Sequence, residues 1–281
     1  MNATSSAAPG PAGSGGIAMI GGGRMALALA EGFTRAGLVA PAEITVYDPA
    51  AEARSQLAAR VAGVRFAASG AEAAASAALV LLAVKPQMAA AACGEIAAAL
   101  RPDATVVSIV AGLPTARLAA LTGTPRVIRV MPNTPSLVGR GVSAVCRTPA
   151  VPAAVVDRVL ELLRSVGHVH EVDEDLLDAV TGLSGSGPGF LALVVEALAA
   201  GGVEAGLPED LALALAVETL AGTGALLEQT REHPAVVRDR VTSPGGTTLA
   251  GLNTLRNRGV PQAVAAAVVA ATARARELGR G

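Results

Sequence analysis

The chain lacks tryptophan and has very few aromatic residues of any kind. Its complete aromatic set is Phe33, Tyr47, Phe66 and Phe190. The core must therefore be built from Ala, Val and Leu, whose small side chains interlock little per residue. Extensive contacts with a second copy would compensate for such a core, so we expect a homo-oligomer. A monomer made of tightly packed, alanine-rich helices is the alternative.

Neither sign of charge dominates, and the formal net charge is −1. The chain has no basic stripe with interleaved aromatics, which argues against nucleic-acid binding. No apolar run approaches the roughly 18 residues that span a bilayer, so we expect no transmembrane helix and no membrane partner. Residues 1–16 lack the basic start and apolar middle of a secretory signal, and we interpret them as a disordered tail.

Cysteine is almost absent as well. Cys93 and Cys146 are isolated and show no Cys-x-x-Cys spacing, and no metal site is expected. Two lone thiols suit a reducing cytoplasm, where we place the protein. We expect both to be small buried apolar residues.

Strand and helix patterns alternate through the first part of the chain. The expected strands are Ile17–Ile20, Ile44–Tyr47, Leu79–Val84, Thr105–Val110, Val127–Met131, Val142–Val145 and Val169–Val172. The expected helices are Met25–Ala36, Ala51–Arg60, Gln87–Leu100 and Ala153–Arg164. This alternation predicts an α/β domain over residues 17–172, with a doubly wound sheet of parallel strands.

The pattern changes near Asp173, and from there onward only helical periodicity is visible. The expected helices are Leu176–Leu183, Pro188–Ala205, Pro208–Gln229, Gly245–Asn257 and Pro261–Leu278. Two of them begin with a proline at the first helical position, directly after a glycine-containing turn. Residues 173–281 are therefore predicted to form an all-α domain.

A glycine-rich turn joins the first strand to the first helix. Residues 21–26 read Gly-Gly-Gly-Arg-Met-Ala, which is a G-x-G-x-x-A pattern. Gly21 permits a tight turn, and Gly23 lets the backbone approach a pyrophosphate at the positive end of the helix. A plain tight turn is the alternative, but the flanking strand and helix favour a dinucleotide.

An acid follows the second strand. Asp48 lies at its tip, where a carboxylate can accept hydrogen bonds from ribose hydroxyls and repel a 2′-phosphate. Arg24 and Arg54 could instead supply cations for that phosphate, or be ordinary solvated charges. The acid slightly favours NADH, and the two arginines leave NADPH open.

Lys85 is the only lysine among 22 basic residues. It follows an apolar strand and precedes Pro86 and Gln87, at the strand end where α/β sheets bind ligands. Arg and Lys differ in shape and hydration, so a retained ammonium suggests a cation beside a cofactor or an anionic substrate. A surviving surface lysine is the alternative.

Another strand end carries Met131-Pro132-Asn133-Thr134-Pro135. Its prolines favour a rigid turn, and Asn133 offers both a donor and an acceptor. We interpret Asn133 as a contact to the nicotinamide amide or to the substrate. An ordinary turn is the alternative, because Asn and Pro favour turns.

The helical part contains a second candidate site. Ser243-Pro244-Gly245-Gly246-Thr247-Thr248 opens a helix, where free N–H groups and three hydroxyls could bind a carboxylate. A Pro-Gly turn with Ser243 or Thr247 as the helix cap is the alternative.

Residues 173–281 contain no lysine, tyrosine or cysteine, and their only histidine is His233, which we expect in a loop. A ketone reductase normally needs a proton donor for the developing alkoxide. A carboxylate site without an obvious strong acid suggests a cyclic imine, because a protonated C=N is already electrophilic.

At this point the chain resembles the pyrroline-5-carboxylate reductase family over residues 17–278. The matching motifs are Ile20-Gly21-Gly22-Gly23, Val84-Lys85-Pro86-Gln87, Pro132-Asn133-Thr134-Pro135, Gly185-Ser186-Gly187-Pro188 and Ser243-Pro244-Gly245-Gly246-Thr247-Thr248. The last two of these motifs together are highly specific to the family.

The resemblance implies reduction of 1-pyrroline-5-carboxylate to L-proline by NADPH or NADH, the last step of proline synthesis. It implies an N-terminal Rossmann-type domain and a C-terminal helical dimerisation domain, with a substrate pocket between subunits. Dimers of this family often assemble further, into decamers.

Site residues follow from the same resemblance. The catalytic candidates are Thr248, with its hydroxyl near the ring nitrogen, and Lys85. The substrate would contact Ser243, Gly245, Gly246, Thr247 and Thr248. The cofactor would contact Gly21, Gly23, Arg24, Met25, Asp48, Ala83, Val84, Lys85, Pro86, Gln87, Ala111, Gly112 and Asn133.

The chain departs from the family at two places. Arg24 replaces the usual Asn after the third glycine, which affects nucleotide preference. Gly189-Phe190 replaces the usual Ala-Tyr, which removes a possible phenol hydrogen bond.

Two other functions fit part of the pattern. A hydroxyacid dehydrogenase could share the two-domain plan, but would need a lysine or similar acid in residues 186–205, where no lysine occurs. A non-catalytic dinucleotide sensor would have no need of a carboxylate site.

Overall fold

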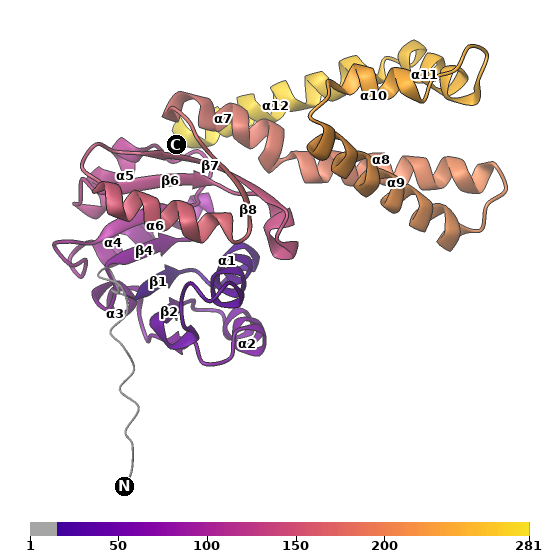
Figure 1. Ribbon diagram of the computed structural model, residues 1–281. Coiled ribbons are helices and arrows are strands. Elements are labelled where there is room, and N and C mark those ends of the chain that lie inside the picture. The colour runs from indigo at the N-terminus through magenta and orange to yellow at the C-terminus, as the bar shows by residue number, and fades with distance from the viewer. Residues whose placement is uncertain (1–15, 281) are drawn as a thin grey trace, which may run out of the picture. The chain divides into compact units, whose positions relative to one another are not determined.

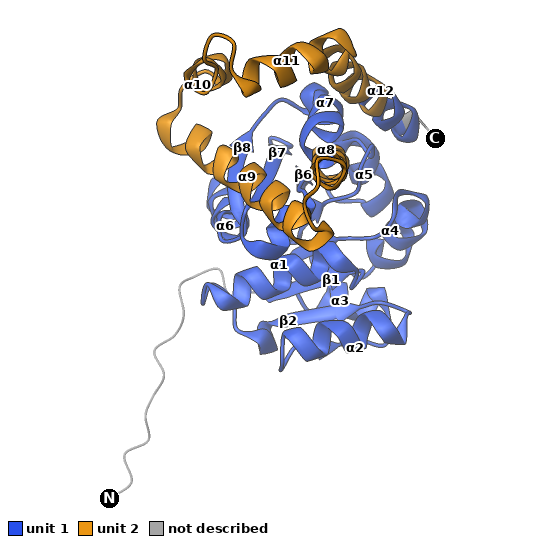
Figure 2. Ribbon diagram, turned by 90° about the vertical axis from the view of Figure 1, so that its right-hand side faces the viewer, with its two compact units in different colours: residues 1–185, 272–281 blue, residues 186–271 orange. Residues whose placement is uncertain are grey.

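The computed structural model describes residues 16–280 (Figure 1). The chain forms two compact units (Figure 2). Unit 1 holds the described residues up to Gly185 together with those from Thr272 onward, and unit 2 holds Ser186–Ala271. The sequence division at 172/173 comes earlier, and the helical turns after it belong to unit 1. The expected tail, apart from Gly16, lies outside the described residues.

Unit 1 contains an eight-stranded sheet of strand order β3-β2-β1-β4-β5-β6-β7-β8. The strands are β1 Ile17–Ile20, β2 Ile44–Tyr47, β3 Arg65–Phe66, β4 Leu79–Leu82, β5 Thr105–Ser108, β6 Val127–Met131, β7 Gly141–Arg147 and β8 Gly167–Glu171. Strand order reverses between β1 and β4, which places a ligand crevice at the carboxyl ends of these strands. The predicted doubly wound α/β fold is confirmed.

One strand departs from the expected parallel arrangement. β7 pairs antiparallel with β6, whereas the other pairs in the sheet are parallel. Only a short 3₁₀ turn, η3 Thr134–Val138, separates the two strands. A parallel return needs a crossover of a dozen or more residues, so this short connection forces antiparallel pairing.

Helices cover both faces of the sheet. They are α1 Arg24–Arg35, α2 Ala51–Arg60, α3 Gly70–Ala75, α4 Ala89–Ala97, α5 Thr115–Thr122, α6 Ala153–Arg164 and α7 Leu177–Val180. The alternation of β1 shows the two layers, because successive side chains of a strand point to opposite faces. Met19 packs with α1 and α6 on one face, and Ile20 packs with α3 and α4 on the other.

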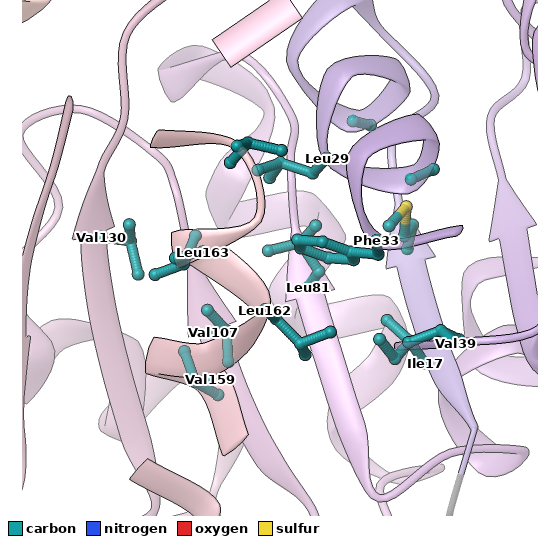
Figure 3. Close-up of a cluster of buried hydrophobic side chains, with 14 of the residues drawn as sticks. Ile17, Leu29, Phe33, Val39, Leu81, Val107, Val130, Val159, Leu162 and Leu163 are labelled. Atoms are coloured by element: carbon teal, nitrogen blue, oxygen red, sulfur yellow. The ribbon is translucent and has the colours of Figure 1, made fainter. Parts of the chain in front are cut away.

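The first of these cores is almost purely aliphatic. Phe33 of α1 lies beside Leu81 and Leu162, and it is the only aromatic residue in this cluster (Figure 3). The predicted core of Val, Leu and Ala is therefore present. Its packing fixes the glycine-rich turn before α1 against the sheet.

Unit 2 is entirely helical. Its helices are α8 Gly187–Glu204, α9 Glu209–Thr230, α10 Pro234–Arg240, α11 Thr247–Asn257 and α12 Val260–Arg280, of which the last returns into unit 1. α8 packs against α9. Gly202 permits this, since a Cβ there would lie 3.1 Å from the Cβ of Ala212.

Helices α8 and α9 both expose apolar side chains. They include Leu191, Leu193, Leu198, Leu213 and Leu215. By length and composition alone, Glu174–Glu204 and Glu209–Thr230 could cross a membrane. The expectation that no segment would qualify is wrong, because Ala and Gly extend the apolar stretches with few charges between them. Such a large exposed patch marks an interaction surface.

Candidate active site

The glycine-rich turn is shaped by contacts that a side chain would prevent. Gly21 has φ +101°, and a Cβ there would lie 2.6 Å from the carbonyl oxygen of Ala83. The Gly21 N–H donates to the carbonyl of Tyr47 at 2.8 Å. Gly23 faces open space, with no atom within 4 Å of its Cβ position. The turn is thus packed on one side and open on the other.

Helix α1 begins at this open side. Gly23 is its N-cap, no side chain caps the helix, and its first turn contains no acidic residue. The first N–H groups of a helix have no partner within it, so they are available to an anion. A pyrophosphate therefore fits the space and the donors at this turn.

Asp48 lies against the same turn. Its Oδ2 accepts a hydrogen bond from the N–H of Gly22 at 2.7 Å, and its Oδ1 accepts one from the N–H of Ala50 at 2.8 Å. Arg54 donates through Nη1 to the carbonyls of Asp48 at 2.6 Å and of Pro49 at 3.0 Å. The side chains of Asp48 and Arg54 thus both stabilise the turn after β2 through hydrogen bonds to its backbone.

A cavity of about 380 Å³ opens beside the turn, which is within the usual range for ligand pockets. The structure gathers there Gly23, Arg24, Met25, Ala83, Val84, Lys85 and Asn133 from the predicted cofactor set. It adds Ile109, Met131, Pro132, Thr134 and Gly185, which were not predicted as cofactor contacts. Four of these, all except Ile109, belonged to motifs already noted, and that was the available signal.

Lys85 is among the residues that line this cavity. It is exposed, and it immediately precedes the 3₁₀ turn η2 Pro86–Met88. Pro86 and Gln87 are exposed and do not line the cavity. The strand end therefore presents a flexible cation to the cavity, and Pro86 fixes the turn behind it.

Ala111 and Gly112 follow β5 and also lie outside the cavity lining. Gly112 has φ +76°, and a Cβ there would lie 2.9 Å from the backbone nitrogen of Gly279 in the last turn of α12. The loop is thus a packing site for the end of α12.

Asn133 is buried, and its amide is engaged within the chain. Its Nδ2 donates to the carbonyl of Ser184 at 3.1 Å, and its Oδ1 accepts from the N–H of Val142 at 2.8 Å. The predicted contact of Asn133 with nicotinamide or substrate is untested by this arrangement. The two hydrogen bonds show that the side-chain amide of Asn133 joins Ser184 to Val142.

Ser184 belongs to a π-helical turn, Thr181–Gly185, which ends at the cavity. A Cβ on Gly185 would lie 2.5 Å from Cε of Met131, so a side chain there would force the Met131 side chain to move. Single π turns within helices are rare and occur often at functional sites.

The helical segment before this turn is fixed by a buried cation. Arg129 of β6, whose side chain is 6% exposed, pairs with Glu174 at 3.3 Å and Asp178 at 3.5 Å. Glu174 also accepts hydrogen bonds from the N–H and the hydroxyl of Thr115, both at 2.6 Å. These contacts join β6, α5 and the start of α7.

The second candidate site lies in unit 2. Gly246 donates its N–H to the carbonyl of Ser243 at 3.0 Å, and Gly245 has φ +70°. Pro at the second position and a left-handed glycine at the third are the requirements of a type II turn. A Cβ on Gly246 would collide with Oγ of Ser243. The sequence Ser-Pro-Gly-Gly therefore specifies this turn closely.

Helix α11 starts directly after the turn. Gly246 is its N-cap, no side chain caps it, and no acid occurs in its first turn. The alternative interpretation, in which Ser243 or Thr247 caps the helix, is thus not observed, and the N–H groups of the first turn of α11 remain available. Thr248 is half-buried, whereas Ser243 and Thr247 are exposed. Donors and hydroxyls of this kind suit a carboxylate.

His233 is better defined than the expected loop residue. Its Nδ1 accepts a hydrogen bond from the N–H of Ala235 at 3.2 Å, which caps α10. Its role in the described chain is therefore local.

Two family models match separate parts of the chain. A family model described as pyrroline-5-carboxylate reductase dimerisation matches residues 174–278. Another, described as NADP oxidoreductase coenzyme F420-dependent, matches residues 16–112.

Relatives and solved structures match nearly the whole chain. Pyrroline-5-carboxylate reductase of Synechocystis sp. is 43% identical over 267 residues, which cover 94% of this chain and 98% of that one. The crystal structure of Plasmodium falciparum pyrroline carboxylate reductase with NADP bound has a TM-score of 0.86 at 29% identity, covering 94% and 98% of the two chains. A Coxiella burnetii pyrroline-5-carboxylate reductase gives 0.85 at 30% identity, with the same coverage.

Proposed function

This chain belongs to the pyrroline-5-carboxylate reductase family, and we propose that the two sites described above hold its coenzyme and its substrate. It reduces 1-pyrroline-5-carboxylate to L-proline with NAD(P)H, the last step of proline biosynthesis. The observation that carries this function is likeness over both units, at 37–43% identity across 93–96% of the chain. Neither the hydroxyacid dehydrogenase nor the sensor is favoured by these relatives.

Residues 17–172 would form the coenzyme domain. The uncapped start of α1, with Gly21 and Gly23, would hold the pyrophosphate, and Asp48 the adenosine ribose. Ala83, Val84 and Lys85 would border the other end of the coenzyme. The bound coenzyme supplies the hydride that reduces the C=N bond. Lys85 would contribute its positive charge near the coenzyme.

Residues 173–281 would form the substrate and dimerisation domain. The N–H groups of Gly245 and Thr247 would bind the substrate carboxylate, helped by the hydroxyl of Ser243, while the Gly246 N–H keeps its hydrogen bond to the Ser243 carbonyl. Thr248 would direct its hydroxyl to the ring nitrogen. Because the reduced product is a neutral amine, the site would need no lysine or tyrosine, and unit 2 has neither.

Replacement of Thr248 tests this assignment. Thr248→Ala should lower kcat/KM for 1-pyrroline-5-carboxylate about tenfold or more, since a hydrogen bond to a charged group is lost. The Kd for NADH or NADPH, measured by coenzyme fluorescence, should stay unchanged. Thr248→Ser keeps the hydroxyl and should retain most activity. Wild-type rates in Thr248→Ala would remove this residue from the mechanism.

The exposed apolar faces of α8 and α9 support a proposal about the oligomeric state. The matched dimerisation family supports a homo-oligomer, in which a second copy covers α8 and α9. We propose a homodimer whose substrate pocket lies between subunits, further assembly into a decamer, and a cytoplasmic location. Light scattering in detergent-free buffer should give at least twice the chain mass of 27.6 kDa. A monomer under these conditions would contradict the dimer.

A further inference from the structure

We propose that Asp48 makes this enzyme select NADH over NADPH, an inference that rests on the coenzyme site assigned above. The two coenzymes differ only by a phosphate on the 2′-oxygen of the adenosine ribose. An acid at the tip of the second strand hydrogen-bonds to ribose hydroxyls, whereas an arginine nearby accommodates the 2′-phosphate. This chain has both an acid and arginines in the region, so their contacts decide between the coenzymes.

The carboxylate of Asp48 is fixed in place. Each of its oxygens accepts a backbone hydrogen bond, one from Gly22 at 2.7 Å and one from Ala50 at 2.8 Å. These donors belong to the turn before α1 and the turn before α2, the two loops that would border the ribose in the coenzyme site proposed above. A carboxylate held from both sides cannot swing away to admit a phosphate without breaking these bonds.

Gly22 contributes in a second way. Its Cβ position lies 3.3 Å from Cβ of Asp48, so the close approach of the acid depends on glycine there. The N–H of Gly22 is also a donor that an incoming phosphate could otherwise use. Asp48 therefore occupies both the space and a donor that a 2′-phosphate would need.

Arg54 is turned toward the backbone. Its Nη1 donates to the carbonyls of Asp48 at 2.6 Å and Pro49 at 3.0 Å. Binding of a phosphate by this guanidinium would compete with both contacts. The arginine that could have favoured NADPH thus stabilises the turn that carries the acid.

Arg24 is the other arginine considered for the 2′-phosphate. It is exposed and is the first residue of α1, beside the N–H groups assigned to the pyrophosphate. In the coenzyme site proposed above, its charge would serve the pyrophosphate that both coenzymes share, so the proposal assigns the discrimination to Asp48. The fixed negative charge of Asp48 does discriminate, because like charges placed close together disfavour binding.

The test compares both coenzymes in three proteins: wild type, Asp48→Asn and the control Asp157→Asn. Asn keeps the size of the side chain and removes its charge. Asp157 is exposed on α6 and does not line the cavity. Dissociation constants for NADH and NADPH are measured by coenzyme fluorescence, and kcat/KM is measured with each coenzyme.

Wild type and Asp157→Asn should bind NADH about tenfold or more tightly than NADPH. Asp48→Asn should bring the ratio of the two dissociation constants close to one, mainly by tighter NADPH binding. A wild type that binds NADPH as tightly as NADH, or an unchanged ratio in Asp48→Asn, would overturn the proposal. The wild-type ratio decides even if Asp48→Asn does not fold, and Asp48→Ser then supplies the second charge-free variant. Absence of turnover with both coenzymes would refute the reductase assignment alone, since the binding ratio is measured without substrate.

Discussion

The side-chain amide of Asn133 donates a hydrogen bond to the carbonyl of Ser184 at 3.1 Å. This bond joins the end of β6 to the π turn Thr181–Gly185, which leads directly into the Ser186-Gly187-Pro188 start of α8. The same amide accepts a hydrogen bond from the N–H of Val142 on β7. One side chain thereby fixes three segments on one side of the cavity.

Asn133→Ala should lower both stability and coenzyme affinity. The change leaves the N–H of Val142 and the carbonyl of Ser184 without their partner, which should reduce the free energy of unfolding by about 1–3 kcal/mol. Urea denaturation measures this loss. Asn257→Ala, at an exposed position of α11, is the matched control and should change stability little. Equal free energies of unfolding for Asn133→Ala and Asn257→Ala would show that the Asn133 amide does not stabilise the fold.

Arg129→Met should destabilise unit 1 more than removal of a surface arginine. It leaves Glu174 and Asp178 without their buried cation, and breaking such a pair costs about 3 kcal/mol. Arg147→Met removes an exposed partner of Glu171 on the same sheet and should cost less than about 1 kcal/mol. Denaturant titration of both variants gives the comparison. A smaller loss in Arg129→Met than in Arg147→Met would contradict a structural role for the buried pair.

Gly246→Ala should impair substrate binding without affecting the coenzyme. The added Cβ would displace the Ser243 hydroxyl from its present position and crowd the Ser243 carbonyl, whose oxygen would lie 3.1 Å away. We expect KM for 1-pyrroline-5-carboxylate to rise about tenfold or more, which corresponds to about 1.4 kcal/mol. Gly94→Ala adds the same methyl group to α4, where no atom lies within 4 Å, and should leave KM unchanged. Steady-state kinetics with varied substrate distinguishes the two variants.

Both thiols should be unreactive in the folded protein. Burial raises the pKa of Cys93 and of Cys146 to about 11, and the nearby Glu174 carboxylate adds to the shift at Cys146. At about pH 8 only about one thiol in a thousand would be ionised, and the ionised fraction grows as pH rises toward the pKa. A disulfide reagent should therefore modify both cysteines in denaturant and neither in native buffer. Rapid modification of native protein would contradict this environment.

Much of unit 1 could be predicted from the sequence. β1, β2, α2, β6 and α6 have the bounds expected from their apolar patterns. Each is a periodic segment between glycine, proline or polar residues, and these flanking residues mark where a helix or strand begins and ends. The glycine-rich turn was also recognisable, because Gly21 and Gly23 stand between a strand and a helix.

Other features depend on contacts that no local pattern reports. β3 is a two-residue strand and α10 is a helix of seven residues that His233 caps, so both are too short for a clear periodicity. The direction of β7 follows from the length of a connection rather than from its residues. The π turn and the amide contacts of Asn133 arise from tertiary packing. The motifs around them could be seen in the sequence, but the partners of these residues could not.

The most direct test of the central claim is a crystal structure of the protein with L-proline and oxidised coenzyme. The account predicts the proline carboxylate on the N–H groups of Gly245 and Thr247, with its ring nitrogen facing the hydroxyl of Thr248. Proline bound elsewhere, without contact to the start of α11, would contradict it.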